Sequence, residues 1–540
     1  MVTSSNSPSI WHRRLIWRGL GSFVLLTALT LGGGDSVYGT DAPAQVLRVG
    51  LDMVAASADP HRLYSVDSRN LAFHIFEPLI LPDDGLGIVP WLATGWEMEG
   101  ERTWVVRLRP DVRFHDGKLL SPHDVAFTFC RLDSMGNGPL AGLIAGVEQA
   151  VARDAHTLVI TTRGTMPLLP HVLTLLPIIP APDGWKGTYQ PRGCAGTADG
   201  LAALSEQRFA DGKVPGTGPY RLASFRSGSS ADLVRTDTYW RARPHWDRVQ
   251  QVILGSGVAR ARALVSGEVD IINQVVPESL DFLSTRPDIK VVDSKPLRIL
   301  MLTVNLAGPL ADVNIRRALA IAIDRAALSK RIAPGSAEPA DQMAPPGIPG
   351  YTPAASIPFD QAEARRLLAQ AGVQEGLRLR LITIEPFARV AEGVARYLLA
   401  IGVQLDIRYA SVGDALPLLR DRDYDLFLGS RVPFTGEMGY SNWELLHTPQ
   451  PEIKAGSQND SGYSNPELDQ ILSQAMVEAD ASRRADLLQQ VAVIASRDLP
   501  FIPLLRTTRR WAMHADLRFD GRVDGNTLAT LITPASASTQ

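Results

Sequence analysis

The chain of 540 residues has only two cysteines and no excess of charge of either sign. With 54 basic residues against 57 acidic ones, it lacks the basic surplus that is typical of nucleic-acid-binding proteins. Two cysteines cannot by themselves supply the ligands of a structural zinc site. Beyond the first 44 residues the sequence has no run of about 18 apolar residues, so it predicts no membrane span there. What remains is an ordinary globular composition that is long enough for more than one compact unit.

The usual sequence signatures of catalysis are also missing. The chain contains no His-Glu-x-x-His pattern of metalloproteases and no Gly-x-Ser-x-Gly elbow of α/β-hydrolases. Its ten histidines are scattered, and we expect His61, His115 and His123 to be surface or capping residues rather than metal ligands. The sequence therefore predicts a protein that is not an enzyme and that holds no cofactor and no metal. Because catalytic groups can be assembled in space, an exported hydrolase stays open as an alternative.

The amino-terminal segment has the layout of a secretory signal peptide. Three arginines between residues 13 and 18 precede an uncharged apolar stretch at 20–31, and Ala42-Pro43-Ala44 supplies a pair of small residues before Gln45. The apolar stretch is short for a membrane span, which needs about 20 residues. We therefore expect a signal peptide at 1–44, cleavage after Ala44 or at Gly39, and a periplasmic mature protein. An uncleaved membrane anchor is the alternative.

Export would place both cysteines in an oxidising compartment. A disulfide between Cys130 and Cys194 would anchor the stretch around Cys194, which is rich in Gly and Pro. The alternative is two buried thiols. We favour the disulfide, because the loop would otherwise be poorly held.

Segments typical of strands and of helices alternate along the chain, which favours an α/β fold. Residues 103–108 (TWVVRL) predict a strand, and Ser121-Pro122 followed by Asp124 predicts the start of a helix. Apolar residues at helical spacing predict further helices over 364–371 and 468–475. The longest loop is expected over about 333–358, and a flexible tail over 533–540.

From about residue 47 onward, many short segments stand in the order found in one family. The chain resembles the extracytoplasmic solute-binding proteins of peptide/nickel-type ABC transporters, family 5, which include oligopeptide- and dipeptide-binding proteins. The segments that carry the resemblance include 57–61 (SADPH), 75–79 (IFEPL), 104–109 (WVVRLR), 114–118 (FHDGK), 216–220 (GTGPY), 266–270 (SGEVD), 312–319 (DVNIRRAL) and 462–469 (GYSNPELD).

The resemblance implies a two-lobed periplasmic-binding-protein fold of α/β class (type II, large form) with a small extra domain. Lobe I is expected at 45–80, 205–295 and 497–540, the small domain at 81–204, and lobe III at 296–496. It also implies the function: the substrate-binding component of an ABC importer, which closes about a hinge over a solute and delivers it to the permease subunits. A sensory binding protein that presents its ligand to a receptor is an alternative.

In peptide-binding relatives the ligand backbone pairs with one strand edge from each lobe. By resemblance, Tyr64, Ser65 and Val66 fall on the first edge, and Gly429, Ser430 and Arg431 on the second. Further residues are expected to line the cleft: Arg298, Asn305, Tyr440 and Asn442.

Relatives that bind free peptide amino termini have an Asp shortly after the second edge, where this chain has Pro433. Arg431 instead offers a guanidinium, which suits a carboxylate or a phosphate. The expected partner is therefore a small peptide-like or anionic solute, with Glu437 as a partner for a ligand cation. The alternative is that Arg431 pairs internally with a residue such as Asp425.

Several points stay open at this level. The ligand could be a peptide, a modified peptide, an opine-like solute, a metal chelate or haem. We expect no nucleic-acid partner and a monomer.

Overall fold

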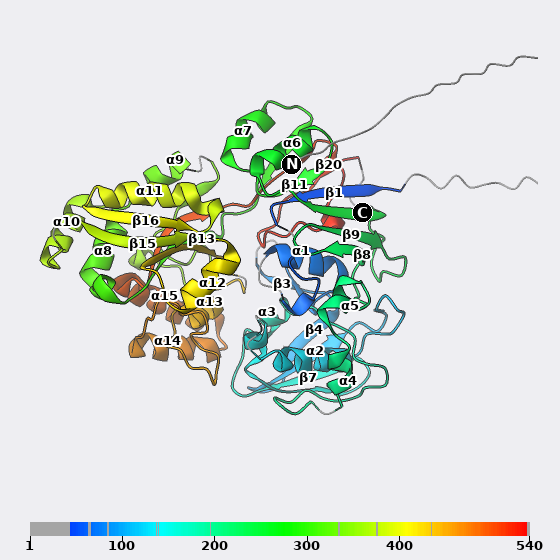
Figure 1. The fold of residues 1–540 in the computed structure, drawn as a ribbon. Helices are drawn as coiled ribbons and strands as arrows, with labels where there is room; N and C mark the ends of the chain where they lie inside the picture. Colours follow the sequence, from blue (N-terminus) through cyan, green and yellow to red (C-terminus); the bar gives the residue numbers. More distant parts are fainter. Residues whose placement is uncertain are drawn as a thin grey trace, which may run out of the picture. The chain divides into compact units, whose positions relative to one another are not determined.

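The computed structural model of the chain describes residues 44–536, except residues 54, 63–65, 84, 85, 137, 139, 195, 333, 334, 374, 375 and 434. The expected signal peptide, apart from Ala44, lies outside the described residues. Two large sheets and one four-stranded sheet carry helices on their faces (Figure 1). This confirms the predicted α/β fold.

The first large sheet has seven strands in the order β12-β19-β11-β1-β10-β9-β8. β1 runs parallel to β10 and β11, and alternate residues of β1, Leu47, Val49 and Leu51, enter one apolar core. We call this sheet with its helices the seven-stranded lobe. Its elements are β1 (Val46–Leu51), α1 (Val66–Ile75), β8 (Tyr220–Arg226), β9 (Ser230–Arg235), β10 (Arg248–Ile253), α6 (Gly257–Val265), β11 (Ile271–Ile272), α7 (Pro277–Ser284), β12 (Ile289–Asp293) and β19 (Arg510–His514).

A smaller antiparallel sheet has the order β4-β5-β7-β6 and is called here the four-stranded domain. The strand predicted over 103–108 is β5, and the helix predicted after Ser121 is α2. The Ser121 N–H donates to the Asp124 carboxylate at 2.8 Å, which fixes the first turn. The elements here are β2 (Ile80–Pro82), β3 (Ile88–Pro90), β4 (Ala93–Met98), β5 (Thr103–Leu108), α2 (Pro122–Ser134), β6 (Val147–Ala152), β7 (Thr157–Thr162), α3 (Leu169–Leu173) and α4 (Ala198–Ala202). The next helix, α5 (Glu206–Ala210), belongs to the seven-stranded lobe, because its buried Phe209 lies in the core of that sheet.

Cys130 and Cys194 form the disulfide that the sequence left as one of two alternatives, with their Cα atoms 5.8 Å apart. Cys130 is buried on α2, and Cys194 lies in the stretch after β7. The bond therefore ties that stretch to the domain core.

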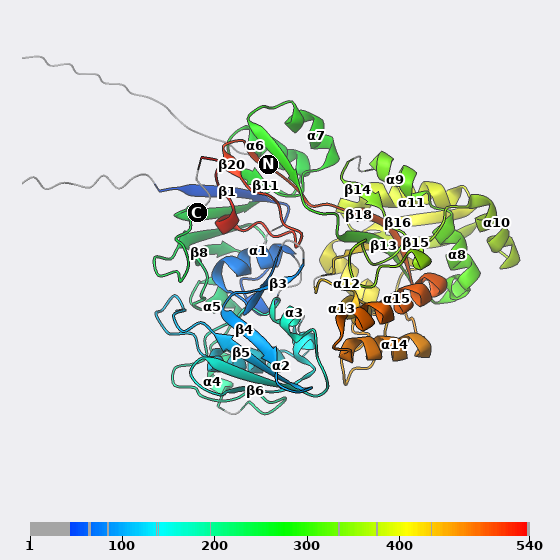
Figure 2. The same ribbon diagram turned by 180° about the vertical axis from the view of Figure 1, so that it is seen from behind.

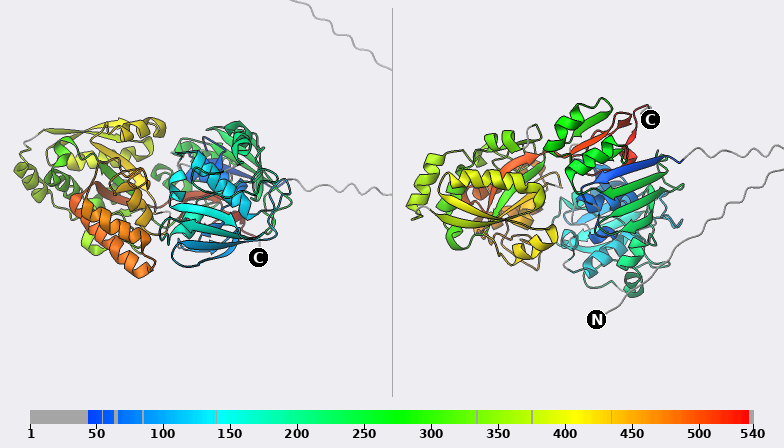
Figure 3. Two further views of the ribbon diagram at one scale, coloured as in Figure 1. Left: turned by 90° about the horizontal axis from the view of Figure 1, so that it is seen from below. Right: turned by 45° about the horizontal axis from the view of Figure 1, so that its top comes forward.

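The second large sheet has six strands in the order β14-β18-β13-β17-β15-β16. Along β13 the residues alternate between two cores: Leu300 and Leu302 join residues of α8, α10 and α11, while Ile299 and Met301 join residues of α14 and α15. Figures 2 and 3 show α14 and α15, in orange, on their face of this sheet. This six-stranded lobe comprises β13 (Arg298–Val304), α8 (Val313–Ile321), α9 (Arg325–Ile332), β14 (Ala337–Pro339), α10 (Gln361–Gln370), β15 (Leu377–Thr383), α11 (Ala388–Leu399), β16 (Val403–Tyr409), α12 (Val412–Arg420), β17 (Leu426–Arg431), α13 (Gly439–Leu445), α14 (Pro466–Val477), α15 (Ala481–Asp498) and β18 (Phe501–Thr507).

The stretches that were expected to be irregular contain some regular structure. The loop expected over 333–358 includes β14, because its backbone pairs with the edge of β18. The tail expected over 533–540 begins with β21 (Thr533–Pro534), which pairs with β20 (Leu517–Arg518). The helices predicted over 364–371 and 468–475 correspond to α10 and α14. The domain boundaries given above stay a prediction.

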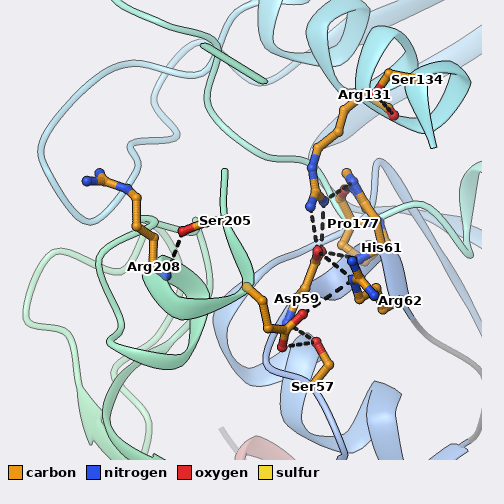
Figure 4. A network of polar contacts seen from close by, with 10 residues as sticks. Ser57, Asp59, His61, Arg62, Arg131, Ser134, Pro177, Ser205 and Arg208 are labelled. Carbon is orange, nitrogen blue, oxygen red and sulfur yellow. Dashed lines mark hydrogen bonds and ion pairs between the residues drawn. The ribbon is translucent and has the colours of Figure 1, made fainter. Parts of the chain in front are cut away.

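A buried ionic network holds the segment after β1 against α2 (Figure 4). Arg131 donates to both carboxylate oxygens of Asp59 and, at 2.7 Å, to Nδ1 of His61, whose Nε2 donates to the Pro177 carbonyl at 2.9 Å. Burial lowers the pKa of His61 to about 4, and the charge of Arg131 adds to this. His61 was expected to be a surface or capping residue. It is fully buried, so the expectation of a surface position is wrong, and its ring completes a network within the core.

Candidate functional site: a hinge and an open strand edge

Two short connections join the two large sheets. Residues 294–297 link β12 to β13, and residues 508–509 link β18 to β19 (Figure 2). Because β12 pairs with β19 and β13 with β18, the connections lie next to each other. The Ser294 N–H donates to the Arg509 carbonyl at 2.8 Å, and the Arg509 N–H donates to the Ser294 hydroxyl at 2.9 Å. Such a pair suits a hinge, since a few residues at element ends can absorb a rotation.

β17 begins between two strands and ends beside only one. β13 pairs with it along its whole length, from Leu426 to Arg431. β15 pairs with it only as far as Leu428, whose partner is Thr383. Among the strands that the structure describes, residues 429–431 therefore have a neighbour on one side only. An open edge of this kind can accept an extended chain through main-chain hydrogen bonds.

Arg431 ends this open edge, and its side chain is half-buried. Its Nη2 donates to Oε1 of Gln458. Glu444 and Asp460 lie close enough to feel its charge. Burial raises the pKa of each of these two carboxyl groups, and the positive charge of Arg431 offsets this in part. The guanidinium is thus held in place by a neutral amide with carboxyl groups nearby.

Asp425, considered above as an internal partner for Arg431, has another partner. Its carboxylate accepts from the Arg380 backbone N–H at 2.7 Å and from Arg380 Nε at 3.4 Å. Asp425 is therefore not the internal partner of Arg431. The reason is the parallel pairing of β15 with β17, which places Arg380 beside the start of β17. Arg431 is bonded internally to Gln458 and lies near Asp460, so the alternative of an internally paired Arg431 stays open.

Glu437, expected as a partner for a ligand cation, is buried and forms an ion pair with Arg484 at 2.8 Å. Burial raises the pKa of Glu437, and Arg484 offsets this in part. Its other oxygen, Oε1, is buried and has no hydrogen-bond partner in the described part of the chain. The role of Glu437 toward a ligand stays a prediction.

The remaining expected ligand residues are spread over several elements. Tyr64 and Ser65 lie outside the described residues, and Val66 is the buried first residue of α1. Asn305 donates to the carbonyls of Arg422 at 3.0 Å and Tyr424 at 2.8 Å, so its amide fastens the turn before β17. Three more stay predictions: Arg298 begins β13, Tyr440 packs against the core of the four-stranded domain, and Asn442 is buried on α13.

No pattern in the sequence pointed to Gln458, Glu444 and Asp460, which lie around Arg431. They lie 13 to 29 residues beyond it, in a stretch without a recognisable motif. Only the return of the chain after α13 brings them together.

A cavity of about 440 Å³ lies elsewhere in the six-stranded lobe. It is lined by residues of β13, β14 and β18, by the start of α9 and by the stretch that follows β14. In the sheet order β14 and β18 lie on the side of β13 away from β17.

Within the described residues, no group of three or more His, Cys, Asp or Glu side chains could hold a metal ion. A search of the same residues finds no helix that is long and apolar enough to span a membrane.

Two lobes joined by paired connections define a two-lobed binding protein. The chain belongs to the family described as bacterial extracellular solute-binding proteins, family 5, whose model (family 5 Middle) matches residues 87–451. This confirms the resemblance seen in the sequence, and the members of this family are solute-binding proteins.

Individual relatives are distant but match over most of their length. The periplasmic oligopeptide-binding protein OppA of Escherichia coli is 22% identical over 520 residues, which cover 92% of this chain and 93% of that protein. Heme-binding protein A of Haemophilus influenzae is 25% identical, covering 77% of this chain and 78% of its own. A dipeptide-binding protein from Pseudoalteromonas in complex with Met-Leu shares the fold, with a TM-score of 0.80 at 20% identity, over 91% of this chain and 100% of that one.

Proposed function

We propose that the chain is the substrate-binding component of an ABC importer, which captures a peptide-like solute in the periplasm and delivers it to permease subunits in the membrane. Family membership and the paired connections between the lobes support this. The periplasmic location, the cleaved signal peptide and a monomeric state are part of the proposal. A ligand moves such a hinge only through its higher affinity for the closed form, and no covalent chemistry is needed.

The observation that carries the proposal is the open edge of β17 at residues 429–431. Main-chain donors and acceptors at such an edge suit a ligand with an extended amide backbone, whatever its side chains. The second edge, by resemblance at residues 64–66, belongs to the proposal as well. Two relatives are named for oligopeptide and dipeptide binding, which fits the same chemistry.

Arg431 narrows the class of solute. Its guanidinium lies at the end of the open edge, and in the described part of the chain only Gln458 is hydrogen-bonded to it. A guanidinium fork pairs well with a carboxylate. We infer a peptide-like solute that presents a carboxylate next to residue 431.

The test is mass spectrometry of small molecules released from protein purified under native conditions, followed by calorimetric titration with the compound identified. We expect a peptide-like compound with a carboxylate, recovered unchanged. Release of haem or of a nickel chelate would overturn the proposed class of solute. A compound that is chemically altered during incubation would instead support the exported hydrolase.

Transport is tested separately from binding. Uptake of the identified compound should be lost when the gene is deleted and restored by the intact chain. Unchanged uptake, together with loss of a response to the compound, would favour the sensory protein.

A further inference from the structure

One small apolar cluster is built from both sides of the junction between the lobes. Its buried members are Leu86, Ala344, Ile348 and Met438. Leu86 lies between β2 and β3, and the neighbouring Leu79, Ile80 and Leu92 belong to the core of the four-stranded domain. The other three members follow strands β14 and β17 of the six-stranded lobe. Figure 1 shows β3 on the side of its domain that faces α13.

The backbones at this cluster approach closely. A Cβ atom on Gly436 would lie 2.5 Å from the Leu86 carbonyl oxygen, so only glycine fits there while the two segments touch. Gly436 also has a positive φ of 74°, which a side chain would strain. Within the six-stranded lobe, the Met438 N–H donates to the Pro349 carbonyl at 3.2 Å. The segment that carries Met438 is therefore shaped to meet Leu86.

The same segment makes a second contact with the four-stranded domain. A Cβ on Gly439 would lie 3.6 Å from Cδ1 of Leu168, the residue before α3. Tyr440, next along the chain, packs against the core of the four-stranded domain. Residues 435–440 thus contact that domain at two places.

These contacts come directly after the open edge at 429–431. Since these contacts join the six-stranded lobe to the four-stranded domain, burial at Leu86 and Leu168 depends on how the six-stranded lobe is rotated about its two connections.

We propose that Leu86 and Leu168 on one side, and residues 435–440 with Ala344 and Ile348 on the other, form an apolar clasp that favours the closed lobes before any solute is bound. The proposal rests on hinge closure as described under the proposed function. Its apolar surface is buried only when the lobes meet, so the clasp sets the closed fraction of the free protein. The apparent affinity for every solute scales with that fraction.

Two variants weaken the clasp in different ways. Gly436→Ala pushes the segments apart, and Leu86→Gly removes the side chain at a residue whose φ of 64° glycine adopts easily. The matched control is Gly212→Ala. Gly212 also has a positive φ, of 67°, and its added Cβ would meet the Leu222 carbonyl oxygen, but both residues lie on the same side of the hinge.

The measurement is small-angle X-ray scattering of the solute-free protein. We expect a larger radius of gyration for Gly436→Ala and Leu86→Gly than for the unaltered chain, and no change for Gly212→Ala, which should only unfold at a lower temperature. An unchanged radius for both clasp variants would overturn the clasp, as would an equal increase in the control.

A second measurement separates the clasp from the solute site. Each clasp variant should weaken the binding of all solutes by one common factor. A tenfold fall in the closed fraction would weaken binding about tenfold. Factors that differ between solutes would contradict it. Because the scattering experiment uses the solute-free protein, it tests the clasp even if the proposed solute class is wrong.

Discussion

The two halves of β17 belong to one strand and share β13 as a neighbour, yet they differ on the other side. Leu426 and Leu428 are fully buried between β13 and β15, within the large core of the six-stranded lobe. Residues 429–431 continue past the end of that pairing and are only partly buried. β17 is therefore paired on both sides in its first half and open on one side in its second, because β15 stops pairing three residues before β17 ends.

The largest expected effect is that acid lowers the stability of the fold through two buried histidines far from the open edge of β17. Burial lowers the pKa of both His61 and His74 to about 4, while an unfolded histidine titrates near 6.5. The unfolded state thus binds more protons below about pH 6.5, and the free energy of unfolding falls until the pH reaches about 4. By about pH 5, each of these histidines should lower the free energy of unfolding by about 2 kcal/mol.

Urea titrations at about pH 7.5 and about pH 5 measure this loss. His61→Gln is the control, since an amide can replace both hydrogen bonds without titrating, and its unfolding should depend less on pH. An equal dependence in the variant and the unaltered chain would contradict the assignment.

The buried half of β17 should carry stability. Leu428→Ala removes a side chain from the large core and should lower the free energy of unfolding by about 3 kcal/mol. Solute affinity of the folded variant, measured by calorimetry, should change by less than about twofold, because residues 429–431 are untouched. Lost affinity without lost stability would reverse the roles given to the two halves.

The open half should carry binding. Arg431→Gln should weaken a carboxylate-bearing solute about tenfold, because the charge-assisted pair is lost. The free energy of unfolding should fall by about 1 kcal/mol, because Arg431 is half-buried and its hydrogen bond to Gln458 is lost. Calorimetry and urea titration of the same preparation measure both.

Arg380→Gln is the matched control for Arg431. Arg380 is an exposed arginine on the neighbouring β15 and pairs with Asp423 and Asp425. The affinity of the Arg380→Gln variant for the solute should equal that of the unaltered chain. Equal weakening in both variants would show a general effect of charge and would remove Arg431 from the site.

The smallest effect is expected for Ser430→Ala. If the solute pairs with the main chain, loss of this hydroxyl should change affinity by less than about twofold in the same titration. A loss of tenfold or more would show that the side chain, and not the strand edge, binds the solute.

Local signals in the sequence predicted local structure well. Both the strand at 103–108 and the helix after Ser121 were predicted, and the helix followed from a capping pair three residues apart. The disulfide depended on an inferred compartment, so the sequence alone left it open. The loop over 333–358 was mistaken in part because nothing in its own residues shows that the edge of β18 is free to pair with β14.

The site was predicted less completely. The segment 429–431 came from family resemblance, and the sequence could not show that β15 stops pairing at Leu428. Partners far apart in the chain were missed: Arg380 for Asp425, Gln458 for Arg431 and Arg484 for Glu437. Tertiary pairing decides these contacts, and residue type alone does not.

The most direct test of binding at the open edge is hydrogen–deuterium exchange of the backbone over β17, with and without the solute recovered from the purified protein. We predict that the solute slows exchange of amides in residues 429–431 and leaves Leu426 and Leu428 as protected as before. Slowed exchange elsewhere in the chain, with residues 429–431 unaffected, would contradict the account.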